Sequence, residues 1–237
     1  MLTAVLAMLS VAISAESRWI APTPPSAPAA PEPRWVWVAA AGAPAPTAQN
    51  APVGTIYLAR SFDAAGGTAT LSLAADNEAA AFLNGERVLQ TRDWSSPVFA
   101  TLSLRAGSNL LVIEARNGPG GAINPGGAIA QITFEKGSSA PIVTDAGWTG
   151  AAEPWPGFPA AAPPETAPRA VDLGPCTTPP WNVKASAFAP APPCPIFRRA
   201  FTLEETPSAA AITMIGLGHY ELRCNGQRVG ETVINQA

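Results

Sequence analysis

Residues 80–89 read AAFLNGERVL, and this stretch decides the fold class. It places Asn84-Gly85 between two short apolar runs. Both central residues of a two-residue type I′ turn need a positive φ, which Asn and Gly adopt at low cost. The stretch therefore predicts a β-hairpin closed by Asn-Gly.

The segments on either side of this hairpin also have strand character. Residues 68–74 and 98–104 alternate polar and apolar, which is the period of a half-buried strand, and residues 110–115 form a continuous apolar run. No segment combines a helical period with capping residues. The strands expected are 35–38, 55–62, 68–74, 80–83, 87–89, 98–104, 110–115 and 128–134. We predict an all-β fold, an antiparallel jelly-roll-like β-sandwich.

An ordered set of short motifs occurs twice. RSF at 60–62 recurs as RAF at 199–201, LSL at 71–73 as ITM at 212–214, and NGERV at 84–88 as NGQRV at 225–229. The second copy has only 12 residues after Asn225. Because a sandwich without its remaining strands would expose apolar faces and open edges, we expect residues 196–237 to be an incomplete second β-sandwich from a longer protein.

Composition predicts the remaining boundaries. Residues 1–15, MLTAVLAMLSVAISA, are predicted to be a signal peptide, and the protein to be secreted or extracytoplasmic. A membrane anchor is the alternative, but the run is shorter than the ~20 residues that span a bilayer. The Pro- and Ala-rich residues 16–33 are predicted to be a linker, 34–148 the first sandwich, and 149–195 a second Pro-rich linker.

Charge and cysteine content narrow the function classes. The formal net charge is −3 and no Lys/Arg cluster occurs, so we expect neither a nucleic-acid nor a membrane partner. The chain has three cysteines, Cys176, Cys194 and Cys224. Two alternatives remain open: a disulfide between Cys176 and Cys194, or three free thiols. Zinc is not indicated, because there is no CxxC motif and only one histidine.

Two motifs resemble a known family. PIFRRAFT at 195–202 and GLGHYELRCNGQRVG at 216–230 resemble the opening strand and a signature of the N-terminal region of bacterial-type α-L-rhamnosidases. Residues 35–37, 75–78, 84–85 and 115–117 resemble a galactose-binding-like jelly roll that precedes this region in many members. The resemblance covers roughly residues 34–148 and 195–237, and it implies a non-catalytic accessory region.

The resemblance also implies where the chemistry lies. In this family a later helical barrel carries the general-acid and general-base carboxylates. We therefore expect no catalytic residue in this chain, whose parent protein would be a glycoside hydrolase. Its expected partners are the missing downstream catalytic domain and rhamnose-containing glycans. The alternative is a β-sandwich interaction module without a glycan ligand.

Three residues match the rhamnose-binding modules of the family, and a fourth is a candidate for contact with the sugar. There, an Asp-Asn pair and a later Asn hold a calcium ion that bridges sugar hydroxyls, and Asp76, Asn77 and Asn117 match this order. Trp94 is the candidate for stacking on the sugar. The alternative is that Asp76-Asn77 only supports a turn and Trp94 only packs.

Overall fold

The computed structural model describes residues 31–135, 140–190, 196–212, 218–230 and 234–235. The expected signal peptide and most of the first linker lie outside these residues. The chain divides into two compact units, one within residues 24–194 and the other mainly within 195–237. Among the residues that the structure describes, none belongs to a helix with the length and apolar character needed to span a bilayer.

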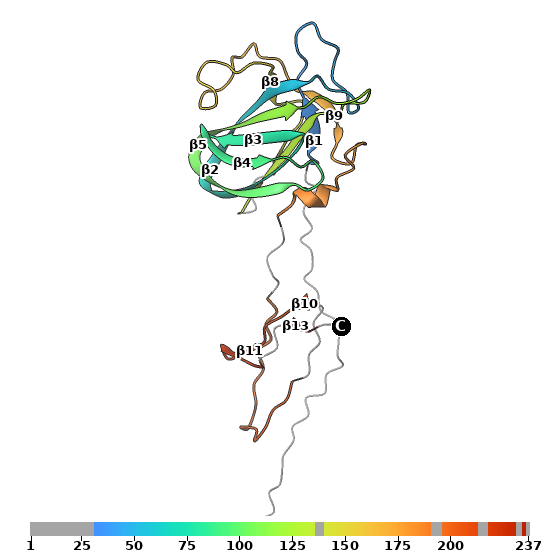
Figure 1. Cartoon of the computed structure of the whole chain (residues 1–237). Coiled ribbons are helices and arrows are strands. Elements are labelled where there is room, and N and C mark those ends of the chain that lie inside the picture. Colours follow the sequence, from blue (N-terminus) through green and yellow to red (C-terminus); the bar gives the residue numbers. More distant parts are fainter. Residues whose placement is uncertain (1–30, 136–139, 191–195, 213–217, 231–233, 236–237) are drawn as a thin grey trace, which may run out of the picture. The chain divides into compact units, whose positions relative to one another are not determined.

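The first unit is one large antiparallel sheet folded into a sandwich (Figure 1). Its strand order is β4-β3-β5-β2-β6-β1-β9, with β7 paired to β6 and β8 paired to β2. The elements are β1 (Arg34–Trp37), β2 (Gly54–Asp76), β3 (Glu78–Leu83), β4 (Glu86–Thr91), β5 (Val98–Asn117), β6 (Gly127–Phe134), β7 (Ile142–Val143), β8 (Thr149–Ala151), β9 (Val171–Pro175) and the short 3₁₀ helix η1 (Ala185–Phe188). The predicted all-β fold is confirmed.

Two long strands, β2 and β5, run through both halves of the sandwich. The first half of β2 pairs with the end of β5 and with β8, whereas its second half pairs with the start of β5 and with β6. Both strands turn the corner at glycines: Gly66, Gly67 and Gly107 have φ of 86°, 101° and 86°. Only glycine adopts these values without strain. The sequence suggested separate strands here, because a Gly pair resembles a turn.

The core follows from strand alternation. Ala79, Ala81 and Leu83 of β3 are buried while the residues between them are not, and Leu71 and Leu73 of β2 are fully buried. Inward-facing side chains of both halves form one cluster. Burial of this apolar surface is the main stabilising contribution to such a domain.

The Asn-Gly hairpin is present in both units. Asn84 and Gly85 have φ of 52° and 94°, and Asn225 and Gly226 have 49° and 84°. In the second unit, β11 (Arg223–Cys224) pairs with β12 (Gln227–Arg228), and β10 (Gly218–His219) with β13 (Ile234–Asn235). Local turn chemistry alone predicts these hairpins.

The expected opening strand of the second unit is not formed. Residues 196–203 contain no strand among the described residues, and Ile196, Phe197 and Phe201 are exposed. A strand needs a paired edge and a buried face, and this segment has neither within the described part of the chain.

The region expected to be a linker, 149–195, instead contributes to the sandwich. Its strands β8 and β9 pair with β2 and β1. Trp181 stacks on Trp35, with ring centroids 4.3 Å apart and an angle of 23° between the planes, and Phe188 is fully buried. A Pro-rich segment forms few strands but can still deliver aromatic side chains to a core. The first domain therefore continues at least to residue 188 rather than ending at 148.

A second apolar cluster covers the outer face of β2 and β5. Residues 152–168, called the strap below, carry Trp155 and Phe158 onto Ala59, Leu110 and Val112. The Trp155 indole donates to the Ala161 carbonyl at 2.6 Å, and this hydrogen bond stabilises the strap internally. The strap therefore closes one part of this face.

The cysteines are described in part. Cys176 is buried with a free thiol, which donates to Glu32 Oε1 at 3.1 Å. Burial, together with Glu32, raises the pKa of this thiol to about 12. Cys224 is free and exposed, and Cys194 lies outside the described residues. Because the Cys176 thiol is free, the disulfide between Cys176 and Cys194 is not formed in this structure.

Trp181→Ala should lower the free energy of unfolding by about 3 kcal/mol, because it removes the stacking on Trp35 and leaves a cavity. Urea denaturation followed by far-ultraviolet circular dichroism measures this change. Trp94→Ala is the matched control, because Trp94 is 39% exposed and should shift stability by under ~0.5 kcal/mol. Equal effects of the two variants would mean that residues 149–195 do not stabilise the sandwich.

Candidate functional site

Asp76 ends β2 and is almost completely buried. Its Oδ2 accepts a hydrogen bond from Trp181 Nε1 at 3.0 Å, and its Oδ1 accepts one from Asn77 Nδ2 at 3.1 Å. Burial raises the pKa of the Asp76 carboxyl above its usual value, and the Trp181 hydrogen bond partly opposes this shift. The carboxylate is thus oriented by an indole while no cation compensates its charge among the described residues.

Asn77 connects Asp76 to the end of β5. Its backbone N–H donates to the Arg116 carbonyl at 3.0 Å, and its Oδ1 accepts from the Gly118 N–H at 2.6 Å. These two bonds lie on either side of Asn117 in the chain. The structure therefore brings Asp76, Asn77 and Asn117 to the same end of the sandwich, as the resemblance implies.

Asn117 is fully buried and only half satisfied. Its Nδ2 donates to the carbonyls of Ala51 and Pro52, at 3.0 and 3.4 Å. Its Oδ1 has no hydrogen-bond partner. A Cβ on Gly126 would lie 2.7 Å from Asn117 Cγ, so the loop after Asn117 packs closely over the amide. A buried acceptor without a donor is uncommon in folded proteins, and a water molecule, an ion or a ligand can supply the missing partner.

Trp94 lies in the loop between β4 and β5. The Asp93 carbonyl of this loop accepts from the Ala75 N–H at 3.2 Å, which fixes the loop beside the end of β2. The Asp93 carboxylate accepts from Ser95 N and Ser95 Oγ, both at 2.7 Å, and these hydrogen bonds lower the pKa of that carboxyl. This hydrogen-bonded turn carries Trp94, whose side chain is partly exposed.

Two further exposed apolar residues flank Asn117. Val53 follows the carbonyls that hold the Asn117 amide and is 60% exposed. Ile123 is 64% exposed, and the carbonyl of its neighbour Asn124 accepts from the Ala51 N–H at 2.9 Å. Exposed apolar side chains around a polar centre are typical of a ligand site.

The candidate residues carry oxygen atoms of the types that calcium binds, the ion that the resemblance implies. Among the described residues, no group of three or more His, Cys, Asp or Glu could hold a metal. Calcium, however, binds carboxylate, amide and backbone oxygens together. One carboxylate (Asp76) and the amides of Asn77 and Asn117 supply such oxygens, and the Asn117 Oδ1 lacks any other partner.

Trp181 is the site residue that sequence reasoning missed. It orients the Asp76 carboxylate from more than one hundred residues away in the chain. The only available signal was a Trp in a Pro-rich stretch, which indicates packing but not a partner.

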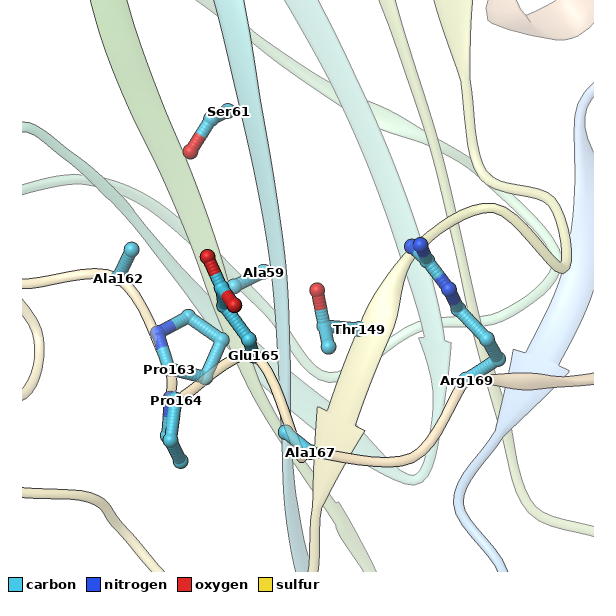
Figure 2. A pocket seen from close by; sticks show the side chains of 9 residues that line it. All are labelled: Ala59, Ser61, Thr149, Ala162, Pro163, Pro164, Glu165, Ala167 and Arg169. Carbon is cyan, nitrogen blue, oxygen red and sulfur yellow. The ribbon is translucent and has the colours of Figure 1, made fainter.

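Two other hollows lie on the outer face of the sheet. One, of about 260 Å³, lies between the strap and β2 and β8 (Figure 2). Glu165 and Thr149 occupy its middle, with Pro163 on one side and Arg169 on the other. Arg169 already donates to the Gly147 carbonyl at 2.7 Å. The second hollow, of about 500 Å³, lies on β3, β4 and β5.

Comparison with known proteins gives structural neighbours. No protein-family model and no curated protein matches the chain. An α-L-rhamnosidase from Streptomyces avermitilis, complexed with L-rhamnose, aligns with a TM-score of 0.56 and 25% identity over 68% of this chain and 16% of that one. A lectin from Pleurotus ostreatus, in complex with GalNAc, aligns with a TM-score of 0.56 and 24% identity over 64% of this chain and 46% of that one.

A family 78 rhamnosidase from a Bacillus species aligns with a TM-score of 0.46 and 19% identity, over 65% of this chain and 19% of its own. The expected resemblance to α-L-rhamnosidases is confirmed by the Streptomyces enzyme. The chain spans about one sixth of the length of the Streptomyces enzyme.

Asp76→Asn should change how stability depends on pH in calcium-free buffer. The folded-state pKa of Asp76 is raised, so the native state holds this proton more tightly than the unfolded state, and the contribution is lost as pH rises through the raised pKa. Relative to Asp76→Asn, the wild-type melting temperature should therefore fall as pH rises from the ordinary aspartate range. Thermal melts across this range measure the difference.

Asp93→Asn is the matched variant of opposite sign. The pKa of Asp93 is lowered, so its contribution is present above the unfolded pKa and is lost as pH falls. A difference between wild type and Asp76→Asn that is flat with pH would contradict the uncompensated burial of Asp76.

Proposed function

We propose that the sandwich of residues 31–190 is a calcium-dependent carbohydrate-binding domain, and that the chain is a non-catalytic accessory region of a secreted α-L-rhamnosidase-like glycoside hydrolase. The observation that carries this proposal is the buried, unpartnered Asn117 Oδ1 at the same end of the sandwich as Asp76 and Asn77, with exposed apolar residues on the neighbouring loops. An accessory role is supported by the small share of the Streptomyces rhamnosidase that the chain covers.

The residues of the site have different roles in binding. A bound calcium ion supplies a positive centre for the oxygens of adjacent sugar hydroxyls. Trp181 holds the Asp76 carboxylate in place, and the Ala51 and Pro52 carbonyls hold the Asn117 amide so that its oxygen stays free. Rigid ligands of this kind lose little entropy on binding.

The apolar rim provides the second half of recognition. One face of a pyranose ring is apolar, and an indole such as that of Trp94 can stack on it while the ring hydroxyls point toward the polar centre. Val53 and Ile123 give the same end of the sandwich further apolar area. L-rhamnose, which the Streptomyces enzyme holds, has a methyl group that suits such a rim.

Catalysis is proposed to belong to a separate domain of the parent protein. Hydrolysis of a glycosidic bond requires two carboxyl groups facing one sugar. Asp76 is the only carboxyl group of the candidate ligand set. The function proposed for this chain is therefore to hold the glycan rather than to cleave it.

Isothermal titration of the 237-residue chain with L-rhamnose in calcium should show binding that EDTA abolishes. Asp76→Ala should remove binding, and Asn117→Ala should weaken it by about tenfold or more. Asp63→Ala is the matched control, because Asp63 is an exposed aspartate near the bend of β2.

Circular dichroism of each variant establishes that the fold is retained. Wild-type chain that binds neither L-rhamnose nor GalNAc with calcium would favour the interaction module without a glycan ligand. Binding of GalNAc alone would retain the glycan-binding domain and contradict its link to rhamnosides.

A further inference from the structure

The hollow on β3, β4 and β5 is open because the strap does not reach it. Outward-facing residues of these strands line it: Glu78, Ala80, Gln90, Arg92, Glu114 and Arg116. On the same face, Leu110 and Val112 are covered by Trp155 and Phe158 of the strap. Its volume of about 500 Å³ lies within the range of small-ligand sites.

The small side chain of Ala80 forms the floor of the hollow, because it lies between two long side chains on the neighbouring strands. Ala80 of β3 pairs with Gln90 of β4 on one side and with Glu114 of β5 on the other. Directly opposed residues in antiparallel strands lie about 5 Å apart, so the methyl group of Ala80 leaves room between the Gln and Glu side chains. A larger side chain at position 80 would fill this space.

Two ion pairs that share Glu78, called the ion-pair row below, close one side of the hollow. Glu78 Oε1 accepts from Arg116 Nη1 at 2.9 Å, and Glu78 Oε2 lies 3.2 Å from Arg92 Nε. Both arginines remain well exposed, at 60% and 87% of their side chains, so they keep donors for a ligand. Exposed pairs of this kind add little stability, which leaves ligand binding as a role for the row.

The charges of the hollow select the class of ligand. Two carboxylates and two guanidinium groups line it, so its formal charge is zero, and Glu114 forms no ion pair within the described residues. An anion would meet Glu78 and Glu114, and a cation would meet both arginines. A neutral ligand with many hydroxyl groups matches the alternating donors and acceptors.

The lining of the hollow begins within two residues of the Asp76–Asn117 site along the chain. Glu78 follows Asp76 and Asn77, Arg116 precedes Asn117, and Arg92 precedes the turn that carries Trp94. The Asp93 carbonyl of that turn is bonded to Ala75. A glycan whose terminal sugar occupies the first site would have to pass this turn to enter the hollow.

We infer that the face of β3, β4 and β5 around Ala80 is a second subsite, which binds a neutral sugar next to the terminal residue of the glycan. This inference rests on the proposed function, because the first site anchors the chain of sugars. The domain then recognises an oligosaccharide rather than a single terminal sugar.

The test compares two probes by isothermal titration in calcium: methyl α-L-rhamnoside, and a neutral trisaccharide that ends in α-L-rhamnose. The trisaccharide should bind the wild-type chain about tenfold more tightly or better. Ala80→Gln should remove this gain by filling the floor, and leave methyl α-L-rhamnoside binding unchanged. Glu114→Gln, which keeps the side-chain shape, should reduce the same gain.

The outcomes separate the subsite from the first site. Arg105→Ala is the control, because Arg105 is exposed and bonded to the Ser108 carbonyl near the bend of β5. Equal affinities for the two probes, or an unchanged gain in both Ala80→Gln and Glu114→Gln, would overturn the subsite and leave the proposed function standing. Loss of both probes from the wild-type chain would contradict the two proposals together.

Discussion

One indole ring, that of Trp181, links the late part of the sandwich to its polar end. It stacks on Trp35 of β1 and donates its N–H to the Asp76 carboxylate. Stacking buries a large apolar area, and the hydrogen bond gives a desolvated carboxylate one of the partners that it requires. The packing of residues 171–188 and the geometry of the candidate site therefore depend on the same side chain.

The bend in β2 brings the rest of the site together. The strand turns at Gly66 and Gly67, so that its start pairs with Asn117 while its end continues into Asn77, which is bonded on both sides of Asn117. A straight strand of 23 residues would place these ends some 75 Å apart, at about 3.3 Å per residue. The glycine corner thus positions the ligand set as well as the sandwich.

Local chemistry could be predicted from the sequence, and long-range packing could not. The Asn84-Gly85 turn depends on two residues, and the alternation of 68–74 depends on seven, so both follow from the residues themselves. The place of Trp181 depends on Trp35 and Asp76, more than one hundred positions away, and no periodic pattern records such a contact. At Gly66-Gly67 the opposite holds. The sequence predicts two separate strands on either side of these glycines, but pairing with β5 and β6 makes β2 a single strand.

The energetics of the polar end give a reason for its composition. Leaving a buried acceptor such as Asn117 Oδ1 without a partner costs about 1–3 kcal/mol, and burying the Asp76 carboxylate adds to this. An apolar residue of similar shape at each of the two positions would avoid both costs. A cation is one partner that would stabilise a desolvated carboxylate and an unpaired amide oxygen together, and this is the reason for the calcium proposed at this end. The hollow around Ala80 differs from this end, because Glu78, Arg92 and Arg116 form partly exposed ion pairs there and the ligand proposed for it is a neutral sugar.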